Sequence, residues 1–365
     1  MKKVITAVVA LMVVALMALG FMQATQHHFD TDKIPDAKGI IFEHLGDSYS
    51  WEVPFSHDCK IPLPCIVQDI KGDWHVFSSA HINHGQVYEA APGVSFKVDE
   101  TEVHHNRLVQ VEADGGKDYR PLDFSFTKNA LGIFIAAFVV ILLVFKVRGW
   151  HKKHGMKAPR KGTAFLEVIV DFVYNDTIRP IMGREAPKYA PYLLTAFFFI
   201  LTMNLLGLIV IFPGGANLTG NLAVTMFLAV CTFLVTNFTG TKHYWKELFW
   251  PDVPMMLKCP VPLMPVIEIF GVFTKPFALM IRLFANMMGG HMVVIVFTML
   301  IFIFSAMYGW VAGAGTTVLS LALSLFMLLL DTLVSFIQAY VFTILSTMFI
   351  FMAHVHEEEH ESIEK

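Results

Sequence analysis

Residues 283–330 have the sequence LFANMMGGHMVVIVFTMLIFIFSAMYGWVAGAGTTVLSLALSLFMLLL, forty-eight positions without Asp, Glu, Lys or Arg. Arg282 precedes the stretch and Asp331 follows it. An α-helix rises about 1.5 Å per residue, so about 20 apolar residues cross the roughly 30 Å of hydrocarbon in a bilayer. The stretch is too long for one simple crossing, and it predicts a membrane protein with at least two helices here.

The composition of the whole chain agrees with this prediction. Its 365 residues are 55% hydrophobic and 16% charged, whereas soluble domains carry about 25% charged residues. A second uncharged stretch lies between Lys188 and Lys242. The formal net charge is only -3, so nucleic acid is not an expected partner.

Apolar runs separated by charged or turn residues predict five membrane crossings. They cover residues 129–145, 191–212, 219–239, 262–307 and 314–353. Pro213-Gly214-Gly215 divides the second crossing from the third. The last two runs are about twice as long as a simple span, so we expect long, steeply tilted helices that bend near Pro276 or Gly289-Gly290. The fold class is therefore an all-α membrane domain over residues 129–355.

The N-terminal third of the chain has a different character. Met1-Lys2-Lys3 followed by an apolar stretch is typical of a signal peptide, here residues 1–24, which is either cleaved or kept as an anchor. In residues 25–128, Gly, Pro, Asn and Asp separate short β-like runs. These runs are 74–77, 94–98 and 108–111. We expect a small β-rich extracytoplasmic domain.

The cysteines and histidines of this domain do not define a site. Cys59 and Cys65 are six residues apart in a compartment where disulfides form, and a disulfide and two reduced thiols are both compatible with this spacing. Nine of the sixteen histidines lie between His27 and His105, without the spacing of a metal site. We therefore expect surface histidines and no bound metal.

Positive charge sets the predicted orientation. Residues 146–188 contain ten Lys or Arg and four Asp or Glu, an excess typical of cytoplasmic loops. Within this stretch, residues 162–182 have helical periodicity and mixed polarity, which suits a helix along the membrane surface. Five crossings then place the acidic tail, residues 356–365, in the cytoplasm as well.

Few ionisable residues remain in the last two crossings. Between residues 261 and 355 they are Glu268, Lys275, Arg282, His291, Asp331 and His354. A charge at membrane depth costs at least about 2.5 kcal/mol and marks a candidate functional residue. Lys275 lies near the cytoplasmic entry, where its long side chain can reach the interface. Arg282 lies two turns deeper.

Helical phase predicts which of these residues share a face. At about 100° per residue, Glu268 and Arg282 lie on nearly one face, about 21 Å apart along the axis. Asn286 shares the face of Arg282, one turn further on. His291 is nine residues after Arg282 and therefore points to the opposite side.

The last crossing carries two further polar residues on one face. Asp331 and Gln338 are seven residues apart, which is two turns. The sequence thus offers two groups of polar residues with the permanent cation Arg282 between them. Because arginine stays protonated in proteins, it can attract a carboxylate while blocking the direct passage of a proton.

Two motifs resemble the a subunit of F-type ATP synthases. Residues 275–291, KPFALMIRLFANMMGGH, look like the signature helix of that family, and residues 331–343, DTLVSFIQAYVFT, look like its final helix. Met203-Asn204, with Asn217-Leu218-Thr219, is similar to an earlier helix pair of the family. The resemblance covers about residues 129–355, and the outer domain is absent from the family's minimal members.

This resemblance implies a stator subunit with two offset half-channels that pass protons to and from carboxylates on a rotating c-ring. Arg282 matches the essential arginine of the family, which keeps the passing carboxylate ionised. Glu268 and Asn286 match positions near the cytoplasmic exit and the ring interface. Gln338 matches the polar residue that faces the arginine.

His291 and Asp331 match a channel pair that many bacterial members carry in the opposite order, acid before histidine. The order found here is similar to that of mitochondrial-type sequences. Either order keeps an imidazole, which titrates near neutral pH, beside a carboxylate. The resemblance therefore assigns the pair to the outer half-channel.

The resemblance also implies partners and a location. The partners are the c-ring, b-type peripheral-stalk subunits, membrane lipid and, indirectly, the catalytic head. The location is a bacterial inner membrane, with the N-terminal domain in the periplasm and the C-terminus in the cytoplasm. The sequence contains no GxxxxGK[ST] motif, so we expect no nucleotide site, no cofactor and no enzymatic activity of the chain on its own.

Two other classes of membrane protein are weaker alternatives. An ion-coupled secondary transporter could use Arg282 to bind an anion, but the sequence has no internal repeat and its polar residues do not converge on one pocket. A quinone-linked respiratory subunit would need paired histidines for haem within the spans, and the sequence lacks them.

The charge pattern predicts that residues 25–125 are extracytoplasmic and residues 148–188 are cytoplasmic. A cysteine introduced by Lys157→Cys should resist an impermeant maleimide in intact spheroplasts and react after lysis. A cysteine placed on the surface of residues 25–125 should react in both samples. Labelling at position 157 from outside would overturn this topology.

Overall fold

A computed structural model describes nine segments of the chain. They are residues 46–52, 60–82, 86–99, 107–111, 119–155, 162–209, 216–249, 263–308 and 310–354. The predicted signal peptide, Cys59 and the tail 356–365 lie outside these residues. The chain divides into two compact units, one with Met1–Ser125 and Gly289–Asp331, the other with Phe126–Met288 and Thr332–Lys365.

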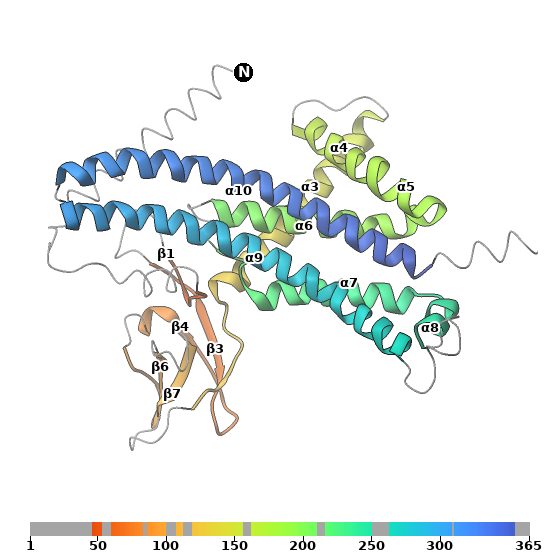
Figure 1. The fold of residues 1–365 in the computed structure, drawn as a ribbon. Helices are drawn as coiled ribbons and strands as arrows, with labels where there is room; N and C mark the ends of the chain where they lie inside the picture. Colours follow the sequence, from red (N-terminus) through yellow and green to blue (C-terminus); the bar gives the residue numbers. More distant parts are fainter. Residues whose placement is uncertain are drawn as a thin grey trace, which may run out of the picture. The chain divides into compact units, whose positions relative to one another are not determined.

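The first unit contains the β-rich region that the sequence predicts. Its strands are β1 (Ser50–Glu52), β2 (Lys60–Pro62), β3 (Pro64–Gln68), β4 (Trp74–Ser78), β5 (Tyr88–Ala91), β6 (Val94–Asp99), β7 (Arg107–Val111) and β8 (Leu122–Asp123). They form antiparallel sheets with the orders β1-β2, β4-β3-β8 and β5-β6-β7 (Figure 1). The three expected runs fall within β4, β6 and β7, so the prediction of a small β-rich region is confirmed.

The interior of this region follows from alternation along the strands. Cys65 and Val67 on β3 point inward and pack with Phe77 on β4 and Phe96 on β6. Cys65 is a free thiol, and burial raises its pKa to about 12, so it stays protonated and unreactive at neutral pH.

Tyr49 joins separate strands at the edge of this core. Its hydroxyl donates a hydrogen bond to Asp123 on β8 and accepts one from the Leu108 amide on β7, at 3.2 Å. Burial, together with the charge of Asp123, raises the pKa of Tyr49 above its usual range. The hydroxyl therefore remains a donor to Asp123, and this bond holds β8 in place.

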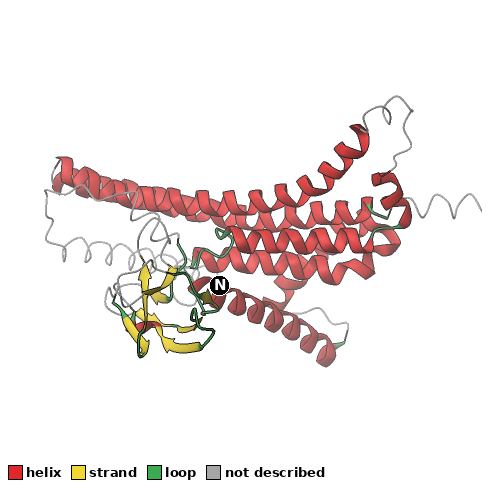
Figure 2. Cartoon of the chain, turned by 90° about the horizontal axis from the view of Figure 1, so that it is seen from below, coloured by secondary structure: helices red, strands yellow, loops and turns green. Residues whose placement is uncertain are grey.

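Five helical stretches among the described residues are long and apolar enough to cross a membrane. They are α3 (Lys128–His154), the stretch Gly162–Leu208, α7 (Leu222–Thr239), and parts of α9 (Leu263–Tyr308) and α10 (Trp310–Met352). A short amphipathic helix, α8 (Lys242–Phe249), follows α7. The expected number of crossings is confirmed, and Figure 2 shows how strongly helix dominates this part of the chain.

The stretch Gly162–Leu208 is helical throughout but not uniform. It comprises α4 (Gly162–Val173), a π-helical turn (Tyr174–Ile178), α5 (Arg179–Met182), a 3₁₀ turn (Gly183–Glu185) and α6 (Ala186–Leu208). Gly183 has a φ of 54°, a conformation that ends α5 at little cost for glycine. The helical character of residues 162–182 is confirmed, whereas a position along the membrane surface stays a prediction.

The ends of α6 differ from the expected crossing at 191–212. The helix begins five residues earlier, at Ala186, because Pro187 suits a first turn, where no amide hydrogen bond is required. It ends at Leu208, and Ile209 has extended backbone angles. The helix therefore ends four residues before the apolar run does.

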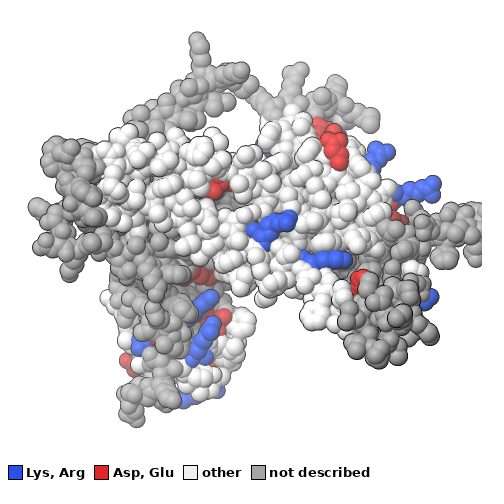
Figure 3. Space-filling model, in the orientation of Figure 1, with Lys and Arg blue, Asp and Glu red and all other residues white. Residues whose placement is uncertain are grey.

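The two long helices have 46 and 43 residues, as their apolar runs predict. α9 remains continuous through Pro276 and through Gly289-Gly290, so the expected bends do not break it. Contacts of Asn286 with Gln338 and of Gly290 with Asp331 show that α10 runs antiparallel to α9. Charged atoms are sparse over the helices in Figure 3 and denser over the β-rich unit. Steep tilt stays a prediction.

A glycine contact fixes how α3 packs in the second unit. A Cβ added at Gly132 would stand 2.6 Å from Leu218 Cδ2 and 3.3 Å from Ala216 Cβ, and Leu218 is fully buried. A side chain therefore cannot be added without displacing the buried Leu218 side chain. Small residues at such positions let membrane helices approach closely.

We expect Gly132→Val to lower the stability of the membrane subunit by about 1–3 kcal/mol, because it overpacks this contact. Gly149→Val on the same helix is the matched control, since nothing lies within 4 Å of a Cβ built there. Thermal unfolding of the purified protein in detergent measures the difference. Equal melting temperatures for the two variants would contradict this account of the α3 packing.

Candidate functional site

Arg282 lies on an exposed face of α9. Its neighbours Leu279 and Leu283 are buried, whereas Arg282 and Asn286 are exposed on the same side of the helix. Glu268, almost four turns earlier, is exposed as well. Because α9 is continuous, the shared face that the helical phase predicts is present. The arginine of this isolated chain is therefore free to meet a partner.

Asn286 and Gln338 connect that exposed face to α10. Asn286 Nδ2 donates a hydrogen bond to Gln338 Oε1 at 2.6 Å. Gln338 is buried beside Ala339 and Phe342. The family resemblance implies that Gln338 faces the arginine, and in the structure its amide oxygen accepts a hydrogen bond from Asn286, one helical turn from Arg282. This bond fixes the register of the two long helices at the arginine.

A buried polar network supports α10 near this position. Thr219 Oγ1 donates to Asn204 Oδ1 at 2.7 Å, and Asn204 Nδ2 donates to the Ser335 carbonyl at 3.5 Å. All three residues are buried, and they connect α6, the segment before α7, and α10. Asn204 and Thr219 belong to the helix pair that resembles the family, and the resemblance assigns them no role. Amides within uncharged membrane stretches were the available signal.

Asp331 packs against the backbone of α9 beside His291. A Cβ added at Gly290 would stand 2.6 Å from Asp331 Oδ1 and 2.7 Å from Oδ2, so the glycine leaves room for the carboxylate. His291 lies within electrostatic range of that carboxylate. The structure thus brings the two predicted partners together. His291 directly follows Gly290, the residue of α9 against which Asp331 packs.

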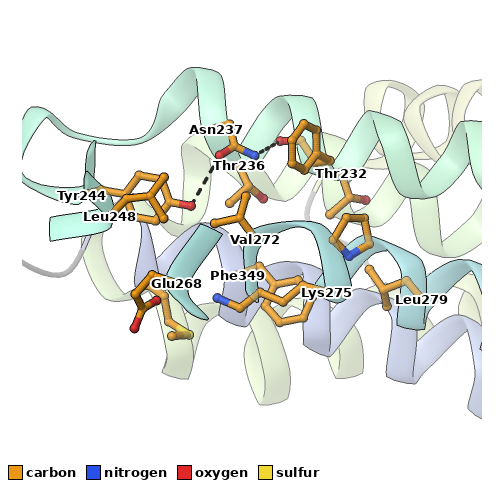
Figure 4. Close-up of a pocket in the computed structure, with 13 residues that line it drawn as sticks. Thr232, Thr236, Asn237, Tyr244, Leu248, Glu268, Val272, Lys275, Leu279 and Phe349 are labelled. Atoms are coloured by element: carbon orange, nitrogen blue, oxygen red, sulfur yellow. Dashed lines mark hydrogen bonds between the residues drawn. The ribbon is translucent and has the colours of Figure 1, made fainter. Parts of the chain in front are cut away.

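A pocket of about 280 Å³ lies in the second unit, between α7, α8, α9 and α10 (Figure 4). Glu268 and Lys275 of α9 line it, and the Lys275 Nζ atom is 5.5 Å from the centre of the Phe349 ring. Such a cation–π contact stabilises a charged amine. From the sequence, snorkelling and a functional role are both open for Lys275, and in the structure its amine lies over an aromatic ring of α10.

Further polar groups reach the same pocket from α7 and α8. Tyr244 Oη donates to Asn237 Oδ1 at 3.4 Å, and Asn237 Nδ2 donates to the Phe233 carbonyl at 2.7 Å. Burial and the charge of Glu268 raise the pKa of Tyr244, so the phenol stays protonated. The pocket therefore presents one carboxylate among groups that donate hydrogen bonds or carry positive charge.

Comparisons with known proteins agree with these features. Residues 131–351 match the family described as ATP synthase A chain, and residues 40–124 match a second family, described as Domain of unknown function (DUF8433). The membrane helices and the β-rich region thus match separate family models.

Curated relatives cover most of the chain. ATP synthase subunit a of Chloroherpeton thalassium is 38% identical over 278 residues, which are 74% of this chain and 77% of that protein. ATP synthase subunit a 2 of Chlorobaculum tepidum is 41% identical over 248 residues, 66% of this chain and 67% of that protein. ATP synthase subunit a of an Anaeromyxobacter species is 33% identical over 335 residues, 88% of this chain and 72% of that protein, so this match extends beyond the membrane helices. The chain belongs to the ATP synthase a subunit family, the proton-channel subunits of F-type ATP synthases.

Proposed function

We propose that this chain is the stator subunit that carries protons through two half-channels to and from carboxylates on a rotating c-ring. The observation that carries the proposal is the exposed Arg282, one turn from the Asn286–Gln338 bond. An exposed cation at membrane depth is costly unless a partner covers it. No observation favours the alternative of a secondary transporter that binds an anion through Arg282.

Arg282 acts on the ring electrostatically. A guanidinium facing a c-ring carboxylate favours its ionised form, because an opposite charge within a few ångströms stabilises the carboxylate. The carboxylate therefore releases its proton as it arrives at Arg282. Since the guanidinium does not lose its own proton, it also separates the two half-channels.

The outer half-channel uses His291 and Asp331. The Asp331 carboxylate lies within electrostatic range of His291, and the helical phase of α9 turns His291 away from the face of Arg282. Protons from the outer side pass along this pair toward the ring. The buried Asn204–Thr219 network, together with Ser335, holds α10 one turn from Asp331.

The cytoplasmic half-channel ends at the pocket that Glu268 and Lys275 line. Glu268 shares the exposed face of Arg282, and the pocket opens beside it among polar side chains of α7 and α8. A carboxylate at an exit accepts protons released from the ring and passes them to water. The two paths are thus offset along α9.

This function implies the complex and the orientation. The chain is not an enzyme on its own, and it works with the c-ring and b-type peripheral-stalk subunits beneath a catalytic head. We place it in a bacterial inner membrane, with the β-rich domain in the periplasm and the C-terminus in the cytoplasm. The basic excess of residues 146–188 supports this orientation.

Arg282→Ala should abolish proton-driven ATP synthesis while the complex still assembles and its head still hydrolyses ATP. Removing the charge ends carboxylate release and opens a leak between the half-channels. Arg282→Lys should fail too, because an ammonium lacks the planar fork and loses its proton more easily when buried. Arg184→Ala, at an exposed arginine of a 3₁₀ turn, is the control and should synthesise ATP normally. Normal synthesis by membranes with Arg282→Ala would refute the mechanism.

The pair His291 and Asp331 gives a second test. His291→Ala should slow proton flux in reconstituted vesicles while assembly persists, because the imidazole no longer relays protons. The exchanged pair, His291→Glu with Asp331→His, should restore part of the flux, since it keeps one imidazole beside one carboxylate. A purely structural ion pair predicts that both variants conduct like the parent once assembled.

A further inference from the structure

The β4-β3-β8 sheet of the first unit has large apolar side chains on its outward face. Trp74 and Val76 on β4 are 54% and 70% exposed. Leu122 on β8 and Phe124 directly after it are 62% and 63% exposed. Antiparallel sheets usually pair one apolar face with one polar face. This sheet has apolar residues on both, because Cys65, Val67 and Phe77 fill its inner face.

The strand register puts these exposed residues on one surface. Trp74 pairs with Gln68, which pairs on its other side with Leu122. The Phe124 amide donates to the Ile66 carbonyl at 2.9 Å, and Ile66 pairs with Val76. The rings of Trp74 and Phe124 are 5.6 Å apart, across β3. We call this surface, made of Ile66, Trp74, Val76, Leu122 and Phe124, the outer sheet face.

Chain connectivity keeps the outer sheet face close to a membrane crossing. Phe124 is three residues before Thr127, whose side chain caps the first turn of α3. Three extended residues span at most about 11 Å. The uncharged part of α3 begins at Asn129, directly after Lys128, so the hydrocarbon boundary lies near the start of the helix. Phe124 therefore lies within reach of the lipid headgroups.

The residue types also fit a lipid surface. Tryptophan is enriched where a protein meets the headgroup region, because its ring is apolar and its N–H is polar. Lys71 and Arg120 are exposed, lie close in sequence to residues of the outer sheet face, and suit anionic headgroups. Asp73, also exposed, carries a negative charge in the same β3–β4 turn as Lys71. We propose that the outer sheet face docks on phospholipid of the outer leaflet. This goes beyond the proposed function, because it depends on α3 crossing the membrane and not on proton transfer at Arg282.

Spin labels in the complete complex test this docking. Val76→Cys is labelled in a variant whose four native cysteines are replaced, and the complex is reconstituted into phosphatidylethanolamine–phosphatidylglycerol vesicles. Val87→Cys is the matched control, because Val87 is 58% exposed in the same region but outside the outer sheet face. We expect the label at position 76 to collide with oxygen several-fold more often than with a water-soluble nickel chelate. The label at position 87 should show the reverse.

Other results would overturn the proposal. Equal exposure of both labels to the nickel chelate would mean that the face is in water. Low collision with both reagents at position 76 would mean that protein covers it, either another subunit or another part of this chain.

A photocrosslinker provides a measurement that keeps the native cysteines. Benzoylphenylalanine at position 76 should capture phospholipid in assembled, ATP-hydrolysing complexes, and the same group at position 87 should not. Capture of a peptide at position 76, or of no lipid at either position, would contradict docking on the leaflet.

Discussion

The structure depends on one constraint, the inability of hydrocarbon to form hydrogen bonds. Several hydroxyls of the long helices meet it by donating hydrogen bonds to carbonyls of their own or a neighbouring helix. Thr298 and Thr343 donate to carbonyls one turn earlier, and Ser320 of α10 donates to the Phe297 carbonyl of α9. Arg282 departs from the pattern, since it stands on an exposed face at membrane depth. The departure makes this position the natural contact for a charged partner.

Small residues let polar groups enter such a bundle without a large loss of packing. Gly290 admits the carboxylate of Asp331 against the backbone of α9, where a methyl group would collide with it. Gly132 similarly admits the segment that contains Thr219, whose hydroxyl is satisfied by Asn204. Close helix approach and buried hydrogen bonds therefore occur together, as is common in membrane bundles.

The features that depend on one helix alone could be predicted from the sequence. Runs without charge gave the five crossings, and a period of 3.6 residues gave the shared face of Arg282 and Asn286. Prediction was less accurate at α6, which runs from Ala186 to Leu208, because Pro187 in the first turn favours an earlier start than hydropathy indicates. The Asn286–Gln338 and Asn204–Thr219 bonds could not be derived from helical phase, because they depend on the register between different helices.

The same distinction applies to the β-rich region. Alternation predicts strands, but an apolar residue looks the same in sequence whether it points to a core or to an exposed sheet face. Only the pairing of β3 with β4 and β8 separates Phe77, which is buried, from Val76, which is exposed. The Tyr49–Asp123 bond holds β8 to the core, because breaking it would leave the hydroxyl hydrogen of the buried Tyr49 without its acceptor. β8, which leads into α3, is thus held to the core through Asp123, and its outward apolar side chain, Leu122, is available to contact lipid.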